Sequence, residues 1–336
     1  MDSKRLERAK ELLDRVYGKY SGSGWKPKAF AGRSRRYLWS DAFGVCNYIS
    51  LYYAHNEDTT YLDQADALIQ DVHKELGRVP STSTTPTAGG LCIGKEDEQD
   101  DGQYFHYLTK WMFALNRMSI ARRDPLYNDW AIALGKVAHR HFVVRGLGGR
   151  PLRMVWKLSV DLQHVLVSHE GNLDAFDGYV MYRLMQQQSD DRQALAKEVA
   201  DMQQLLERKL PVFATDDVLD AGEALWLTRW FPRENWAVAV AHIAMNTIDR
   251  LFLAGVLDGD PRFRLLFREM GTVLGIEVAV TPCHVDYKPW HQRIERVLQF
   301  WNERVFAHDT DISPLMFAAA LVPGVWDPNR CHQTVP

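Results

Sequence analysis

The chain of 336 residues has few cysteines and no long apolar run. Its four cysteines stand at wide and irregular spacing, which is not the pattern of a disulfide framework, so we expect reduced thiols in a cytoplasmic protein. The first ten residues are charged and helical in pattern, and we therefore expect no signal peptide. No apolar run approaches the roughly 20 residues that a membrane span needs, so we expect no membrane partner.

The chain also has little net charge, since the formal charge at pH 7 is −3. Its basic residues are scattered rather than clustered, which argues against a nucleic-acid partner. Neither a glycine-rich phosphate loop nor a nucleophile elbow is present, so two common classes of catalytic motif are excluded. We expect a small-molecule substrate, no cofactor and no metal ion.

Strand patterns are scarce, whereas helical periodicity recurs along almost the whole chain. Apolar residues at helical spacing predict an amphipathic helix over Lys4–Tyr17. Residues 42–55 are apolar nearly all round and predict a buried helix. Thr60–Leu76 is again amphipathic, and the alternation continues as far as the apolar segment Ile312–Leu321. This pattern predicts about twelve helices, with the amphipathic member of each pair first.

Six apolar helices inside six amphipathic ones predict an all-α toroid, because closing the inner ring buries every side of an inner helix. Ser40–Gly44 and Leu173–Gly178 share Asp-Ala-Phe at two inner-helix starts, which supports an internal repeat. Val and Leu alternate within Pro151–Val167, which predicts a short β-hairpin at the cavity mouth. The whole pattern resembles the (α/α)6 barrel, the six-hairpin architecture of many glycosidases and sugar epimerases. The resemblance implies a single domain over residues 1–336 and a carbohydrate-active enzyme, with a glycoside hydrolase as the first expectation.

In that architecture, the loops that enter the inner helices meet at one mouth of the barrel. Every clearly identified entrance except that of the fifth inner helix carries at least one carboxylate. These entrances are residues 39–41, 96–101, 169–174, 217–220 and 309–311. We therefore expect acidic side chains from distant parts of the chain to surround one cavity.

Glycoside cleavage needs two carboxyl groups, one protonated and one ionised, and crowding of like charges separates their pKa values. Residues 94–102 hold five carboxylates ahead of a helix, which is more than helix capping needs. We therefore predict Asp101 as one catalytic carboxyl group. Asp41 is the second, and its place at an inner-helix start resembles that of the catalytic aspartate in unsaturated glucuronyl hydrolases. The alternatives for the acidic run are a solvated, capped loop or a Ca²⁺ or Mg²⁺ site.

Residues near these entrances are predicted to bind the sugar, which we expect to be short or to carry a uronic acid. Aromatic faces stack on sugar rings, while basic and acidic side chains contact hydroxyl or carboxylate groups. The predicted binding residues are Trp39, Lys95, Asp97, Tyr104, His169, Asp174, Lys288 and Trp290.

A histidine pair defines the first alternative, a sugar epimerase or isomerase. His106 lies about one helical turn beyond Asp101, so both side chains can face one cavity, and we count His106 among the catalytic candidates. Sugar epimerases of this fold move a proton between two histidines, whose pKa suits that role. The partner of His106 would be His169, His242 or His284.

Two further alternatives are retained. Residues 98–101, Glu-Gln-Asp-Asp, resemble the acidic motif of class II terpene cyclases, which also use α/α barrels and aromatic cavities. The last alternative is a non-catalytic toroid that binds a partner or ligand at its mouth. A cavity without ionisable groups of shifted pKa would favour that role.

Overall fold

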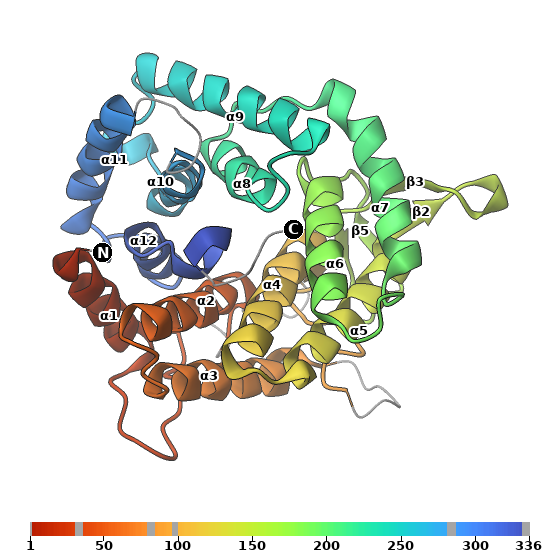
Figure 1. Ribbon diagram of the computed structural model, residues 1–336, viewed down its shortest axis with the longest axis horizontal. Helices are drawn as coiled ribbons and strands as arrows, with labels where there is room; N and C mark the ends of the chain where they lie inside the picture. The colour runs from red at the N-terminus through yellow and green to blue at the C-terminus, as the bar shows by residue number, and fades with distance from the viewer. Residues whose placement is uncertain (1, 31–35, 79–84, 96–99, 281–286, 331–336) are drawn as a thin grey trace.

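The computed structural model describes residues 2–30, 36–78, 85–95, 100–280 and 287–330. Across these ranges the chain forms twelve α-helices and five short strands. The helices alternate along the chain between an outer and an inner position (Figure 1). The outer helices are α1 (Ser3–Tyr17), α3 (Thr60–Leu76), α5 (Pro125–Phe142), α7 (Ala196–Lys209), α9 (Asn235–Leu253) and α11 (Tyr287–Asn302). The inner helices are α2 (Leu38–Ala54), α4 (Phe105–Arg122), α6 (Asp174–Gln188), α8 (Val218–Thr228), α10 (Leu266–Val280) and α12 (Ser313–Leu321).

The six inner helices form a closed ring (Figure 1). Each contacts the next in order, and α12 packs against α2 to complete the circle. Helix α2 is buried without interruption from Leu38 to Tyr52, whereas the outer helix α1 buries a single face that includes Leu12 and Leu13. Although the inner helices are apolar, no helix in the described ranges has the length and hydrophobicity needed to cross a membrane. The (α/α)6 barrel predicted from the alternation is confirmed.

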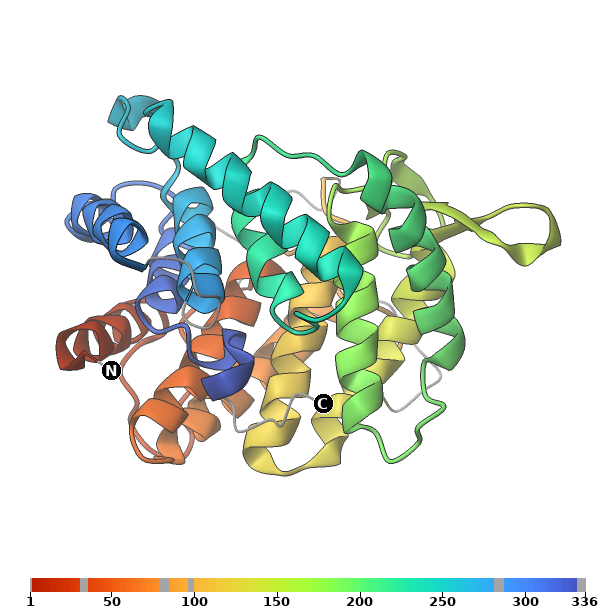
Figure 2. The ribbon, with the colours of Figure 1, turned by 45° about the horizontal axis from the view of Figure 1, so that its top comes forward.

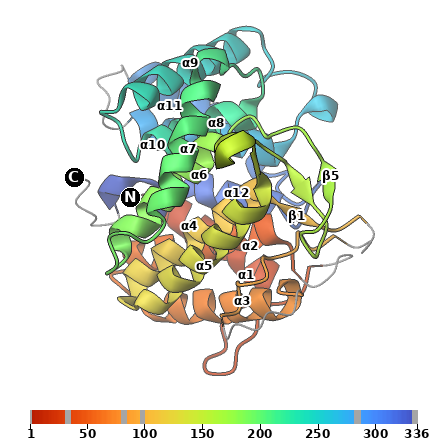
Figure 3. The ribbon, with the colours of Figure 1, turned by 90° about the vertical axis from the view of Figure 1, so that its right-hand side faces the viewer.

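Strands β1 (Gln103–Tyr104) and β5 (Val165–Val167) lie at one end of this ring (Figure 3). With β4 (Lys157–Leu158) they form an antiparallel sheet. Strands β2 (Val143–Arg145) and β3 (Pro151–Met154) form a separate hairpin, which projects from the barrel (Figure 2). The hairpin predicted over Pro151–Val167 is therefore only partly correct. That segment changes partners at Val155 and Trp156. The N–H of Val155 donates to Phe142, the residue just before β2, and the N–H of Trp156 donates to Val167 in β5.

An aromatic cluster fills the inside of the ring. Trp326, in a short 3₁₀ turn near the C-terminus, stacks on Phe43 and Phe113 with ring centroids 4.8 and 4.6 Å apart. The ring of Trp226 meets Trp326 edge-on at 5.0 Å. These rings lie further along their helices than the first turns, so the barrel is closed at depth and hollow near the starts of its inner helices.

The closest contact between inner helices is the one between α8 and α10. A Cβ atom built on Gly275 would lie 2.2 Å from the carbonyl oxygen of Gly222. Because this neighbour is a backbone atom of a packed helix, it cannot move aside without separating the two helices. We expect Gly275→Ala to lower the free energy of unfolding by about 1–3 kcal/mol, the usual cost of overpacking a core. Urea denaturation measures the change, with Val238→Ala on the exposed side of α9 as the control. A stability equal to that of the wild type would contradict the close packing.

Candidate active site

A cavity of about 500 Å³ opens where the inner helices begin. Every inner helix contributes to it through its first turns or the residues just before them. The described residues that line it are Tyr37, Trp39, Tyr104, His106, Tyr107, Trp156, His169, Glu170, Gly171, Asn172, Asp217, Leu219, Asp220, Glu223, Phe267, Arg268 and Ile312. The predicted convergence of the helix entrances on one mouth is therefore confirmed. The volume of the cavity lies within the range of small-molecule pockets, about 300–1,000 Å³.

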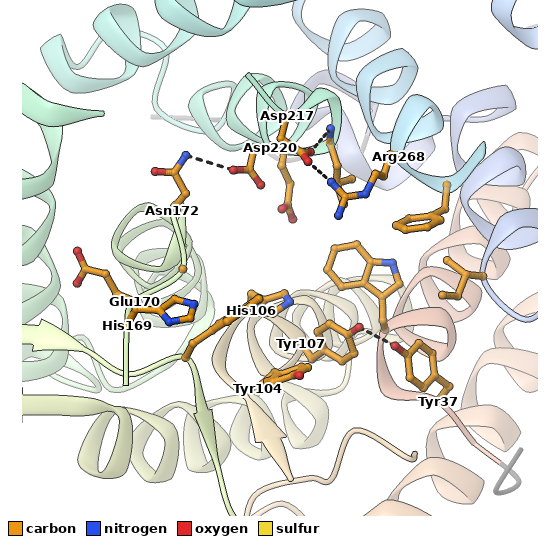
Figure 4. A pocket seen from close by; sticks show the side chains of 17 residues that line it. Tyr37, Tyr104, His106, Tyr107, His169, Glu170, Asn172, Asp217, Asp220 and Arg268 are labelled. Atoms are coloured by element: carbon orange, nitrogen blue, oxygen red, sulfur yellow. Dashed lines mark hydrogen bonds and ion pairs between the residues drawn. The ribbon is translucent and has the colours of Figure 1, made fainter. Parts of the chain in front are cut away.

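Two of its walls have opposite chemistry (Figure 4). The first, the aromatic wall, consists of Tyr37, Trp39, Tyr104, Tyr107 and Trp156. These rings pack on one another, with the centroids of Trp39 and Tyr107 5.3 Å apart and those of Tyr104 and Trp156 5.5 Å apart. The indole N–H of Trp39 has no hydrogen-bond partner in the described part of the chain. That nitrogen is buried, so the wall offers a ligand its ring faces rather than this donor.

The second, the acidic wall, consists of Asp217, Asp220 and Glu223, all from the start of α8. Asp217 caps this helix by accepting from the N–H groups of Leu219 and Asp220 at 2.8 and 3.2 Å, and it also pairs with Arg268. Figure 4 places Asp217, Asp220 and Arg268 across the cavity from Tyr104 and Tyr107. A ligand in the cavity therefore has aromatic faces on one side and carboxyl groups on the other.

A buried lysine lies behind the acidic wall. Lys110 of α4 has no exposed surface, and its ammonium group lies 2.8 Å from Asp177 and 2.5 Å from Glu223. It also lies 5.7 Å from the ring centroid of Trp39 and 5.3 Å from that of Trp226, at distances typical of cation–π contacts. Lys110, Asp177 and Glu223 thus form a cluster, named here the lysine cluster, that joins α4, α6 and α8.

One ammonium group cannot neutralise two buried carboxylates. Burial raises the pKa of Glu223 to about 7 and that of Asp177 to about 6, even though Lys110 lowers both. Burial alone would lower the pKa of Lys110, but the two carboxyl groups outweigh it and raise that pKa. Near neutral pH the lysine cluster therefore holds a charged lysine, one carboxylate and a proton on the second carboxyl group.

Two more acids flank the lysine cluster. Burial raises the pKa of Asp174 to about 7, although the N–H of Gly171 donates to its Oδ2 at 2.7 Å. Burial and the nearby Glu223 raise the pKa of Asp220, whose Oδ2 accepts from the amide of Asn172 at 3.2 Å. Asp174, a predicted binding residue, is buried behind Gly171 and is not among the described lining residues.

Sequence reasoning missed Lys110, Asp177 and Glu223, although a signal was present. Asp174-Ala-Phe-Asp177 and Asp220-Ala-Gly-Glu223 place two acids three residues apart in the first turns of α6 and α8. Residues at this spacing share one face of a helix, and acids are favoured at the positive end of the helix dipole. A lysine within an almost wholly apolar helix is the natural partner for such acids.

His106 is held in one tautomer by its neighbour Trp156. The indole N–H of Trp156 donates to Nδ1 of His106 at 2.9 Å, and indole nitrogen is a donor only. The neutral ring must therefore carry its proton on Nε2. Burial, helped by the positive charge of Lys110, lowers the pKa of His106 to about 3. Near neutral pH His106 offers a ligand an N–H donor rather than a free basic nitrogen.

The structure corrects the catalytic assignment of Asp41. This carboxylate is fully buried and is not among the described lining residues. It accepts hydrogen bonds from the hydroxyl of Tyr17 and the N–H of Tyr37, both at 3.0 Å, and lies 3.5 Å from Arg36. Burial raises its pKa to about 6. Asp41 therefore holds the entrance of α2 in place and does not face the cavity.

Asp101 is corrected for the same reason. It accepts from the N–H groups of Gly94 and Gly102 at 3.1 and 2.9 Å and pairs with Arg78 at 3.2 Å. These bonds fix the loop ahead of β1, and Asp101 is not among the described residues that line the cavity. Asp101 is also the last residue of the cyclase-like stretch, whose first two residues lie outside the described ranges.

The other predicted residues divide into three groups. Trp39, Tyr104, His106 and His169 line the cavity. Lys95 is half-buried, and Trp290 packs on Phe252 and Arg293 next to the outer helix α9; neither is among the described lining residues. His242 is exposed on α9. Asp97 and His284 lie outside the described residues, as does the side chain of Lys288.

Within the described ranges, no group of three or more His, Cys, Asp or Glu side chains could hold a metal ion. The acids behind the cavity surround the ammonium group of Lys110 instead. The position that a cation would take among these carboxyl groups is thus occupied by a side chain.

Replacing Lys110 should make the free energy of unfolding depend more steeply on pH. A buried carboxyl group whose pKa is raised stabilises the fold while protonated, and this contribution is lost as the pH rises through the folded-state value, here about 6 and 7. In Lys110→Met no cation remains for either carboxylate, so we expect a loss of about 3–5 kcal/mol that is larger above neutral pH than below it. Urea denaturation across this range measures the loss, with the exposed Lys136→Met as the control. A pH-independent loss would contradict the role assigned to Lys110.

No family model matches the chain, and no curated protein matches it. Solved structures do. A family 76 glycoside hydrolase from a bovine Bacteroides thetaiotaomicron strain is 9% identical with a TM-score of 0.60, and the match covers 95% of this chain and 76% of that one. A D-mannose isomerase is 11% identical with a TM-score of 0.61, and the match covers 95% of this chain and 96% of that one. A reducing-end-xylose releasing exo-oligoxylanase is 13% identical with a TM-score of 0.52, and the match covers 97% of this chain and 94% of that one. At these identities, the comparisons establish a shared fold, the (α/α)6 barrel.

Proposed function

We propose that this protein is a carbohydrate-active enzyme that hydrolyses a glycosidic bond of a short saccharide, with residues 1–336 acting as one domain. The observation that carries the proposal is the aromatic wall facing the acidic wall across one cavity. A sugar ring has apolar C–H faces and a polar rim, and these two walls match both. Proteins with this fold include two named as glycan-cleaving enzymes and one named as a sugar isomerase, which supports the same substrate class.

Binding would orient the sugar before any chemistry. One face of the ring would stack on Trp39 or Tyr104, and the Nε2–H of His106 would donate to a hydroxyl oxygen. On the other side Asp220 and Asn172 would contact the polar rim. Such fixed contacts on two sides hold the scissile bond beside the acidic wall.

Glu223 is the general acid of the proposed reaction. It retains a proton near neutral pH because it is buried, and it lines the cavity. Its proton passes to the glycosidic oxygen, which leaves with the electron pair of the C–O bond as an alcohol. A water molecule forms the new bond to the anomeric carbon and gives its proton to Asp220, which lies one turn away on α8.

The test is turnover on a panel of glycosides by wild type and Glu223→Gln. Glutamine keeps the shape but cannot donate the proton, so we expect kcat to fall at least about 100-fold. Wild-type kcat should also decrease as the pH rises through about 7, because the acid is then lost. Glu207→Gln removes the same group from the exposed side of α7 and should leave kcat unchanged. Full activity in Glu223→Gln would remove it from the mechanism.

A sugar isomerase is the second candidate, and the tautomer of His106 favours it. A neutral imidazole with its proton on Nε2 can polarise a carbonyl oxygen while a carboxylate moves a proton between neighbouring carbons. Running the same panel in D₂O separates the two reactions. Isomerisation by this route places deuterium on a sugar carbon without cleaving a bond, whereas hydrolysis yields two fragments and no carbon-bound label.

A further inference from the structure

The described side chains of the cavity carry an excess of negative charge. Arg268 is the one lysine or arginine among the described lining residues. It is already paired with Asp217. The carboxyl groups that line the same cavity are Glu170, Asp217, Asp220 and Glu223.

The groups directly behind the lining do not reverse this balance. Asp174 and Asp177 are buried there, and Lys110 is bound between Asp177 and Glu223. Even with Asp174 and Glu223 protonated, the ionised carboxylates outnumber Lys110 and Arg268, and both of these cations are in ion pairs. A third cation, Lys157, lies 5.4 Å from the ring centroid of Tyr104 but donates to the carbonyl oxygen of Asp100 and is not among the described lining residues. A low-dielectric cavity strengthens the resulting field, so an anionic ligand is repelled and a cationic one attracted.

The aromatic wall acts in the same direction. The faces of tryptophan and tyrosine rings carry partial negative charge and attract ammonium groups within about 6 Å. Trp39, Tyr104 and Tyr107 all line the cavity, so their ring faces are available to such a group. In Figure 4 the carboxyl group of Asp220 lies beside Asn172 and that of Glu170 lies on the other side of Asn172, pointing away from the aromatic wall. The Oε2 atom of Glu170 accepts from the N–H of Met154 at 3.2 Å.

We propose that the substrate is a saccharide bearing a positively charged amino group, which lies between the aromatic wall and the carboxylates of Glu170 and Asp220. This inference rests on the proposed function and specifies its substrate class. It replaces the uronic acid expected from the sequence, because a carboxylate on the sugar would meet Glu170, Asp217 and Asp220 with no unpaired cation among the described lining residues.

Calorimetric binding of four monosaccharides tests the proposal. Glucosamine and N-acetylglucosamine differ from glucose at C2, where only glucosamine is charged, and glucuronate carries its negative charge at C6. The measurement is made slightly below neutral pH so that the amine is charged. We expect glucosamine to bind at least tenfold more tightly than glucose and N-acetylglucosamine, and glucuronate to bind most weakly. Added salt should reduce the preference.

Glu170→Gln locates the charge that is responsible. It should reduce the preference for glucosamine over glucose at least threefold, whereas Glu207→Gln on the outer helix α7 should leave it unchanged. Equal binding of glucosamine and glucose, or binding of none of the four sugars, overturns the inference. Cleavage of neutral glycosides that depends on Glu223, without any preference for amines, also overturns the inference but leaves the proposed function standing. A preference for amines with no cleavage of any glycoside supports the binding site and removes the hydrolase.

Discussion

The cavity depends on one buried ammonium group, that of Lys110. A charge without exposed surface is strongly destabilising unless it is paired and hydrogen-bonded, and Lys110 is surrounded by Asp177, Glu223 and two indole faces. These contacts tie α4, α6 and α8 together at the level where the cavity ends. Because one cation serves two carboxyl groups, a proton remains on the cluster near neutral pH. A structural requirement of the barrel thus produces an acid where a bound sugar would lie.

The closed ring explains why the acids gather there. All six inner helices begin at the same end of the barrel, and each helix start carries about half a positive charge from its aligned peptide dipoles. Backbone N–H groups at these starts bond directly to Asp217 and to Asp174. These interactions favour the ionised carboxylates, but burial is the larger effect, since the pKa values of Asp174 and Glu223 lie above their ordinary range. The result is a mixture of protonated and ionised acids around one cavity.

Helical periodicity was enough to predict the fold, because an inner helix of a closed ring must be apolar on every side. Element boundaries were less certain. Helix α10, for example, begins only at Leu266, because Pro261 begins a short 3₁₀ turn that ends before the helix. The aromatic lining was also predicted in part: Trp39 and Tyr104 are in the cavity, where their rings pack on Tyr107 and Trp156.

The catalytic acids were not predictable in the same way. An acid at an inner-helix start can turn toward the cavity or toward partners elsewhere, and Asp41 is bound by Arg36 and Tyr17 while Asp101 is bound by Arg78. Which of these occurs depends on contacts across the fold, which a single sequence does not contain. The pairing of Lys110 with Asp177, 67 positions away, is of this kind. The repeated spacing of two acids on α6 and α8 was the one local sign of the site.

The central claim is that Glu223 carries a proton beside an ionised partner. Infrared difference spectroscopy of wild type against Glu223→Gln, at a pH just below about 7, measures this directly, because a protonated carboxyl group has a carbonyl stretch distinct from that of a carboxylate. The account predicts a protonated-carboxyl band in the wild type that is absent from the variant and disappears as the pH is raised above neutral. Loss of only carboxylate bands in the variant would contradict it.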